Sequence, residues 1–177
     1  MMQSSELCEW QLLVILITMK FIYGMYLQKR LSSGKAEFMC PGNEIPKWFS
    51  CRTEGSSMNI KLPLHWSDDS NFLGIALCSV CAISVPFLFH RYECDMILKT
   101  NNGETHSVNL ASTEGNKTDD PTVDTDHVLV WYDTVHAISD EAKWSVEASF
   151  DFYTVLCRKR WNKVKRCGVC FLYARPR

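Results

Sequence analysis

Residues 72–85, FLGIALCSVCAISV, restrict the fold of this chain more than any other stretch, because 14 consecutive positions hold no charged side chain. The run is rich in small and β-branched residues. Such a run is typical of a central strand that is covered on both of its faces. The chain is therefore predicted to build its core around this strand.

Several shorter segments predict the other strands of the fold. At residues 145–154, Val146, Ala148, Phe150 and Phe152 alternate with polar residues, which predicts a strand with one buried and one solvated face. The sequence NNG at 101–103 separates two further predicted strands and is a strong hairpin signal. Further strands are predicted at 56–62, 127–133 and 164–173, with one helical turn at 140–144. About seven short strands without alternating helices predict an all-β fold, an antiparallel β-sandwich of jelly-roll or immunoglobulin-like type.

The segment PGNEIPKWFS at 41–50 places an aromatic pair between prolines and the first predicted strand. Pro41 and Pro46 cannot donate to a sheet ladder, so this segment is predicted to run along the edge of the sandwich. Trp48 and Phe49 are then expected to close the open end of the core, where each would bury on the order of 150 to 250 Å².

The N-terminal part is predicted to be separate from this β domain. The run from Trp10 to Leu27, WQLLVILITMKFIYGMYL, is mostly apolar, but Lys20 interrupts it. Three interpretations stay open: a short helix that packs on a neighbour, which we favour, a membrane anchor, and a secretory signal. We predict an apolar helix and linker at residues 1–36 and a β-sandwich domain at 37–177.

Composition and cysteine usage narrow the class of protein. The formal net charge is -1, so no overall field favours nucleic acid, and the basic residues at 158–166 are interpreted as solvated charges on strands. The nine cysteines are scattered and mostly apolar in context, which indicates free thiols in a reducing compartment. The chain is expected in the cytoplasm or nucleus, or at a membrane if residues 10–27 anchor it.

Two C-x-x-C pairs, Cys78 with Cys81 and Cys167 with Cys170, raise the question of a zinc site. Both pairs fall within predicted strands, where residues three apart point to opposite faces. The two sulfurs of a pair are then unable to share one metal. No phosphate-binding loop, nucleophile elbow or paired-carboxylate pattern accompanies the five histidines. We therefore predict no metal, no cofactor and no enzyme activity, although a Cys–His catalytic pair stays an alternative.

Several quoted stretches resemble one known family. The sequence CPGNEIPKWFSCRTEGSSMNIKLPLHW, followed by FLGIALCSV, resembles the C-terminal jelly-roll/Ig-like domain, C-JID, of plant TIR-type nucleotide-binding leucine-rich-repeat immune receptors. DHVLVWYD, EASFDFY and VKRCGVCFLYA resemble later strands of that family, in the same order. Cys51, Cys81 and Cys170 depart from the family pattern. The matching residues of the opening are Pro41, Gly42, Glu44, Ile45, Pro46, Trp48, Phe49, Gly55, Ser56, Ser57, Leu62, Pro63, Trp66, Phe72, Gly74, Ala76, Leu77 and Cys78.

The resemblance implies a non-enzymatic recognition module of plant defense that helps to bind a pathogen effector protein or stacks on a leucine-rich-repeat domain. The chain would then be a truncated or standalone relative of a full receptor. Contacts are expected from loops at one edge of the sandwich, a typical location of binding residues. A glycan-binding jelly roll, with a platform of Trp66, Trp131, Trp144 and Trp161, is the alternative. The candidate contact residues are His65, Trp66, Asp68, Asp69, Glu114, Lys117, Asp119, Asp120, His136 and Lys143.

Overall fold

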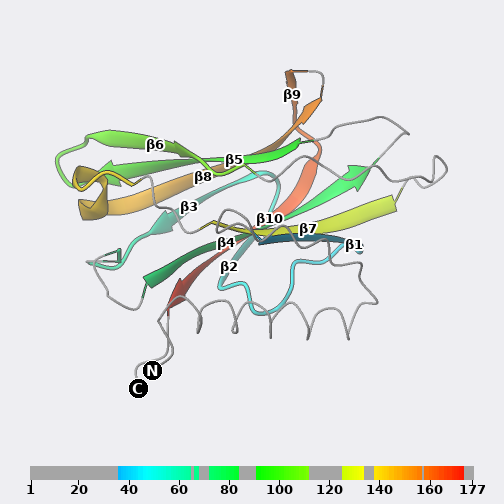
Figure 1. Ribbon diagram of the computed structural model, residues 1–177, viewed down its shortest axis with the longest axis horizontal. Helices are drawn as coiled ribbons and strands as arrows, with labels where there is room; N and C mark the ends of the chain where they lie inside the picture. Colours follow the sequence, from blue (N-terminus) through cyan, green and yellow to red (C-terminus); the bar gives the residue numbers. More distant parts are fainter. Residues whose placement is uncertain are drawn as a thin grey trace.

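The computed structural model describes residues 36–64, 66–67, 72–83, 91–111, 125–133, 138–156 and 158–173. These residues form ten strands and one 3-10 turn (Figure 1), which confirms the predicted all-β fold. The strands are β1 (Ala36–Pro41), β2 (Cys51–Glu54), β3 (Ser57–Lys61), β4 (Phe72–Ile83), β5 (Arg91–Thr100), β6 (Thr105–Asn109), β7 (Thr125–Asp133), β8 (Ser145–Leu156), β9 (Lys159–Trp161) and β10 (Val164–Tyr173), and the 3-10 turn is η1 (Glu141–Trp144).

The strands form two antiparallel sheets that pack face to face (Figure 1). One sheet has the order β1-β7-β4-β10-β2, and the other has the order β3-β8-β5-β6, with β9 paired to the end of β8. The uncharged strand β4 lies in the middle of the first sheet, between β7 and β10, as its composition predicted. The predicted hairpin around residues 101–103 joins β5 to β6, and Gly103 has a positive φ of 90°.

The main core lies between the two sheets. Strand β8 places Ala148, Phe150 and Phe152 in this core, so the predicted alternation is confirmed. Trp131 of β7 packs edge-on against Phe152, with ring centroids 5.8 Å apart. Its buried indole nitrogen donates to the Leu110 carbonyl oxygen at 3.2 Å. The indole N–H is thus satisfied inside the core, where an unpaired donor would cost about 1–3 kcal/mol.

A second, smaller apolar cluster lies on the outer face of the first sheet, and it corrects the prediction for residues 41–50. Trp48 and Phe49 do not close the open end of the main core. They pack with Ala76, Cys78 and Val80, which are the residues of β4 that point away from the other sheet. The cause is that β4 is apolar on both faces, so its outer face also needs a cover. The proline-rich segment supplies part of that cover.

The predicted N-terminal helix and the run from Trp10 to Leu27 lie outside the described residues. Strand β1 begins at Ala36, one residue before the predicted start of the β domain. Among the described residues, no helix is long and apolar enough to cross a bilayer.

Candidate interaction surface

Two of the ten predicted contact residues fall in the described part of the chain, Trp66 and Lys143. The structure places Trp66 in the core, with 2% of its surface exposed. Its ring meets Phe72 and Phe171 edge-on, at centroid distances of 5.5 and 5.7 Å. Trp66 is therefore a packing residue in this structure. The others lie outside the described residues: His65, Asp68, Asp69, Glu114, Lys117, Asp119, Asp120 and His136.

Lys143 lies at one end of the sandwich beside two highly exposed apolar side chains. Leu64 is 80% exposed and Trp144 is 60% exposed. The amide of Leu62 donates to the carbonyl oxygen of Val146 at 2.8 Å. The segment that leads on to Leu64 therefore lies beside the segment that comes from Trp144. Leu64 thus lies at the same end of the molecule as Trp144, which is the last residue of η1.

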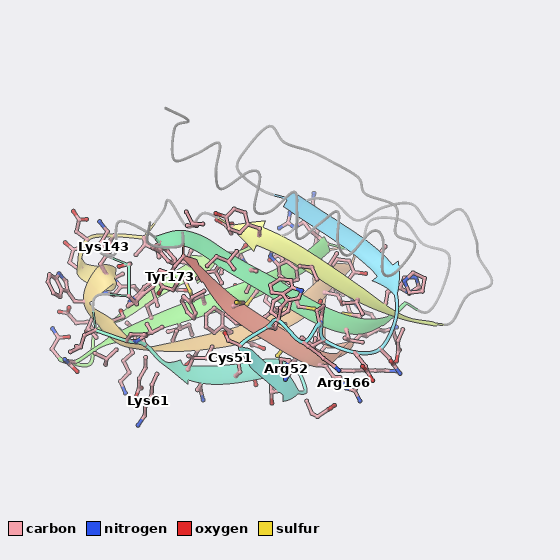
Figure 2. The ribbon with its side chains drawn as sticks, turned by 90° about the horizontal axis from the view of Figure 1, so that it is seen from below. Cys51, Arg52, Lys61, Lys143, Arg166 and Tyr173 are labelled. Carbon is pink, nitrogen blue, oxygen red and sulfur yellow. The ribbon has the colours of Figure 1, made fainter. Side chains whose placement is uncertain are left out.

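Charged residues of both signs lie at the same end of the sandwich as Leu64 and Trp144. The Lys143 ammonium donates to Asp140 Oδ1 at 2.6 Å, and this hydrogen bond lowers the pKa of the Asp140 carboxyl. Lys61 is exposed at the end of β3, and Figure 2 shows Lys61 and Lys143 at the same end of the sandwich. We call Leu64, Trp144, Lys61, Asp140 and Lys143 the rim patch. An apolar centre with a charged border is typical of protein-binding surfaces.

Sequence reasoning did not predict Leu64 at the surface, and it placed Trp144 there only as part of the alternative glycan platform. Leu64 continues the inward alternation of Met58, Ile60 and Leu62 on β3, and Trp144 continues that of Val146 and Ala148 on β8. Both would be core residues if the sheets extended further. A large apolar residue that continues the inward alternation past the end of a strand is a signal that could have found them.

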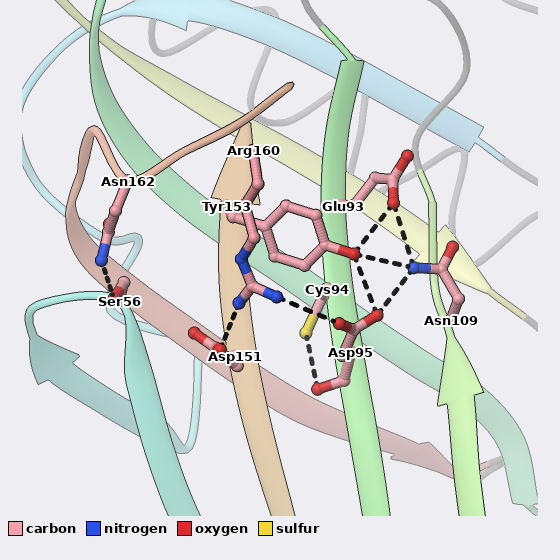
Figure 3. Close-up of polar contacts among 9 residues, drawn as sticks. All are labelled: Ser56, Glu93, Cys94, Asp95, Asn109, Asp151, Tyr153, Arg160 and Asn162. Carbon is pink, nitrogen blue, oxygen red and sulfur yellow. Dashed lines mark hydrogen bonds and ion pairs between the residues drawn. The ribbon is translucent and has the colours of Figure 1, made fainter. Parts of the chain in front are cut away.

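A polar network lies on the outer face of the second sheet, toward the end where β9 pairs with β8 (Figure 3). The Tyr153 hydroxyl lies 3.0 Å from Glu93 Oε2 and 3.0 Å from Asp95 Oδ1. Asn109 Nδ2 donates to the same two carboxylates, at 3.1 and 2.8 Å. The Arg160 guanidinium lies 3.7 Å from the centre of the Tyr153 ring. The network therefore joins β5, β6, β8 and β9 on one face.

Each acid of this network has donor partners, which indicates a structural role. Burial alone would raise the pKa of the Glu93 carboxyl. Hydrogen bonds from Arg91, Tyr153 and Asn109 outweigh that effect and lower it. Burial and the two neighbouring carboxylates raise the pKa of Tyr153. Glu93 is thus held as an anion and Tyr153 as a neutral donor, an arrangement that rigidifies the sheet.

Glu93→Gln is expected to lower the free energy of unfolding at pH 7 by about 1–3 kcal/mol, because it removes the charge that Arg91 and Tyr153 stabilise. A carboxyl with a lowered folded-state pKa stabilises the fold above its unfolded value, near 4.3, and loses that effect as the pH falls through the folded value. The difference in the free energy of unfolding between the wild type and Glu93→Gln should therefore become smaller below about pH 4. Urea unfolding from pH 7 to pH 3.5 measures it. Exposed Glu147→Gln is the control, and an equal loss in both variants would contradict the network's role.

The two C-x-x-C pairs have the geometry that strand alternation predicted. Cys81 and Cys167 belong to the main core, whereas Cys78 and Cys170 lie in or against the outer cluster. The members of each pair therefore point to opposite faces. Within the described residues, no group of three or more His, Cys, Asp or Glu side chains is placed to hold a metal ion.

Buried cysteines in the core should react slowly with iodoacetamide at pH 8. Burial raises the pKa of Cys81 to about 11 and that of Cys167 to about 12. For Cys81 this lowers the thiolate fraction about 100-fold relative to an ordinary thiol. Mass spectrometry should find the half-exposed Cys51 and Cys170 alkylated first, and the buried thiols only in urea. A buried thiol that reacts faster than free cysteine would support the alternative of a catalytic Cys–His pair.

The fold defines a class of protein, an antiparallel β-sandwich domain. The model of the C-JID domain family matches residues 40–177. The chain therefore belongs to the C-JID family, the domain of plant disease resistance proteins that its sequence resembled.

Three relatives illustrate this membership, all from Arabidopsis thaliana. Disease resistance protein RPP2B is 30% identical over 76% of this chain and 13% of its own length. Disease resistance protein RPS4B is 32% identical over 75% of this chain and 12% of its own length. Disease resistance-like protein CSA1 is 34% identical over 52% of this chain and 8% of its own length. The chain thus spans about an eighth or less of the length of these relatives.

Proposed function

We propose that this chain is a non-enzymatic recognition module of plant innate immunity, which binds a pathogen effector protein through the rim patch. The observation that carries the proposal is the exposed pair of Leu64 and Trp144 at the end of a rigid sandwich. Tryptophan is enriched among residues that dominate binding energy, and a border of charged residues excludes water around it. The loops that were predicted to make contacts flank this patch in the sequence, at 65–70 and 134–143.

The same proposal covers the relation of the chain to a full receptor. The match covers only 13% and 12% of the length of two relatives, which supports a module that acts beside, or as a piece of, a receptor with leucine-rich repeats. We propose that residues 37–177 form the module and that the preceding residues connect it to such repeats. The leucine-rich-repeat domain is then a second protein partner.

We further propose a cytoplasmic or nuclear location, with a membrane anchor at residues 10–27 as the alternative. The six cysteines that the structure describes in full are all free, which supports a reducing compartment. Fractionation of leaf cells that express the full chain with a C-terminal fluorescent tag would decide between them. Recovery in the membrane pellet after a high-salt wash would favour the anchor.

The glycan-binding alternative is disfavoured by the arrangement of its platform. Trp66 and Trp131 are each 2% exposed, so they are unavailable to a sugar ring. Trp144 precedes the first residue of β8, while Trp161 pairs with Thr154 of the same strand. Nine strand residues separate the two exposed rings by about 30 Å.

The proposed function is tested by binding of the full chain to a panel of secreted pathogen effectors and to the leucine-rich repeats of a relative. We expect at least one partner to bind, and Trp144→Ala to weaken it about 30-fold or more, as for a binding hot spot. Ile97→Ala is the control, since it removes an exposed apolar side chain of β5 that lies outside the rim patch. A panel without a binding protein, or equal effects of the two substitutions, would overturn the proposal.

A further inference from the structure

The hairpin formed by the end of β8 and by β9 carries a concentration of positive charge that the rim patch does not explain. Residues 158–166, RKRWNKVKR, hold six basic side chains and no acidic one. In Figure 1 the β9 hairpin projects above the sandwich, away from η1 at the left end, and β9 pairs with the last residues of β8, whereas η1 precedes the first. The two surfaces are thus separated by the length of β8.

At least three of the six cations are engaged by acids of the same chain. Arg160 pairs with Asp151 and Asp95, Lys165 with Asp126 at 2.7 Å, and Arg166 with Glu54 at 2.9 Å. Within the part of the chain that the structure describes, Arg158 and Lys159 have no ion pair, and both are exposed. Their charge is therefore available to an outside partner.

An exposed aromatic ring lies beside these charges. Trp161 is 46% exposed, and the Lys163 ammonium lies 5.9 Å from the centre of its ring. Because paired residues share a face, Trp161 and Lys159 lie on the side of β9 opposite to Arg160. We call Arg158, Lys159, Trp161 and Lys163 the hairpin patch.

The hairpin is held rigidly, so its patch is organised before any partner binds. On the outer side, Arg160 stacks on Tyr153 and pairs with Asp151 (Figure 3). Thr154 Oγ1 donates to the Trp161 carbonyl oxygen at 3.1 Å. Asn162 Nδ2 donates to Ser56 Oγ at 2.9 Å, which ties the end of β9 to the turn before β3. A preorganised surface loses little conformational entropy on binding.

We propose that the hairpin patch binds a short acidic segment of a protein partner, with an apolar side chain of that segment packed on Trp161. The available charge is compact, because the neighbouring cations Arg160 and Lys165 are already paired with Asp95, Asp151 and Asp126. These ion pairs neutralise the adjoining positive charge, so a short peptide segment fits the patch better than a long nucleic acid backbone. The net charge of -1 likewise supplies no overall attraction for nucleic acid.

The test uses the full chain and a fluorescent 12-residue peptide of glutamates with two leucines, followed by anisotropy at low salt. A glutamine-for-glutamate peptide, a single-stranded 12-mer DNA and phosphatidylserine vesicles are the comparison probes. We expect the acidic peptide to bind, and the variant Arg158→Asn/Lys159→Glu/Trp161→Ala to bind at least about 10-fold more weakly. Asn suits position 158 because Arg158 has a positive φ of 62°, a conformation that Asn tolerates.

Lys99→Glu is the charge control, because Lys99 lies opposite Glu147, about 26 Å along β8 from Val155, and belongs to neither patch. It should change the affinity by less than about twofold. Lys159→Glu alone, which leaves Trp161 and the turn intact, should already weaken binding if the patch is the site. No peptide binding, tighter binding of DNA or vesicles, or an equal effect of Lys99→Glu would overturn the proposal. The rim variant Trp144→Ala should retain peptide binding, so failure of the proposed function and failure of this inference are distinguishable.

Discussion

Replacing Phe49 with alanine is expected to lower the free energy of unfolding by about 3–5 kcal/mol, a large part of the stability of an ordinary domain. The Phe49 side chain is 1% exposed and belongs to the cluster on the outer face of β4. Its ring stacks on Trp48 with centroids 4.0 Å apart. Removal of the ring leaves a cavity over the sheet and frees the proline-rich segment that covers it.

The local sequence explains why Phe49 packs so closely. Gly168 of β10 lies beneath the segment, and a Cβ atom there would come within 2.8 Å of Ile45 and 3.3 Å of the Phe49 ring. The absent side chain at Gly168 lets both residues rest directly on the sheet. The two motifs PGNEIPKWF and KRCGV, which are far apart in the sequence, are therefore two halves of one contact.

Urea unfolding of the full chain, followed by circular dichroism, measures the effect of Phe49→Ala. The matched control is Trp161→Ala, which removes an exposed aromatic ring and should change the free energy of unfolding by no more than about 0.5 kcal/mol. A loss below about 1 kcal/mol for Phe49→Ala would show that residues 41–50 do not stabilise the outer face.

Gly74→Ala is expected to destabilise the protein by at least about 3 kcal/mol, through backbone strain and steric overlap together. Gly74 has a φ of 145°, a conformation that L-residues rarely adopt. An added Cβ would also lie 2.4 Å from the Asp133 carbonyl oxygen and 2.8 Å from the Tyr132 ring. The carbonyl belongs to β7, so relief of the overlap requires β4 and β7 to separate.

Thermal unfolding should show a fall in Tm of about 6 °C or more for Gly74→Ala, since 1 kcal/mol corresponds to about 2–4 °C in a protein of this size. Gly103→Ala is the matched control. Gly103 also has a positive φ, of 90°, but no atom lies within 4 Å of the Cβ position. Gly103→Ala should therefore lower the free energy of unfolding by about 1 kcal/mol, through the backbone conformation alone. Equal effects at the two glycines would contradict the close approach of β4 to β7.

The strand pattern was predictable because it depends on local alternation and turn chemistry. The seven predicted strands correspond to β3–β8 and β10, and η1 corresponds to the predicted helical turn. The missing strands β1, β2 and β9 have at most six residues each. Strands that short are defined mainly by the partner they pair with, and the partner is not encoded nearby.

The candidate surfaces were less predictable, because exposure depends on where a sheet ends. Trp66 was named as a contact candidate and lies in the core, where its ring meets those of Phe72 and Phe171. Trp144 was placed in a hypothetical sugar platform and instead lies at the rim with Leu64. The local sequence around a tryptophan in a turn-rich segment is of the same kind whether its ring is buried or exposed.

Residue order alone thus established an all-β chain, the positions of its main strands and its family, since each rests on side-chain periodicity and short motifs. The tertiary structure decided which sheet face Phe49 covers, which of the tryptophans meet solvent, and which cations of residues 158–166 are already paired. Those properties arise from contacts between strands up to 120 residues apart along the chain, such as β2 with β10, or Phe49 with Gly168. No window of neighbouring residues contains that information.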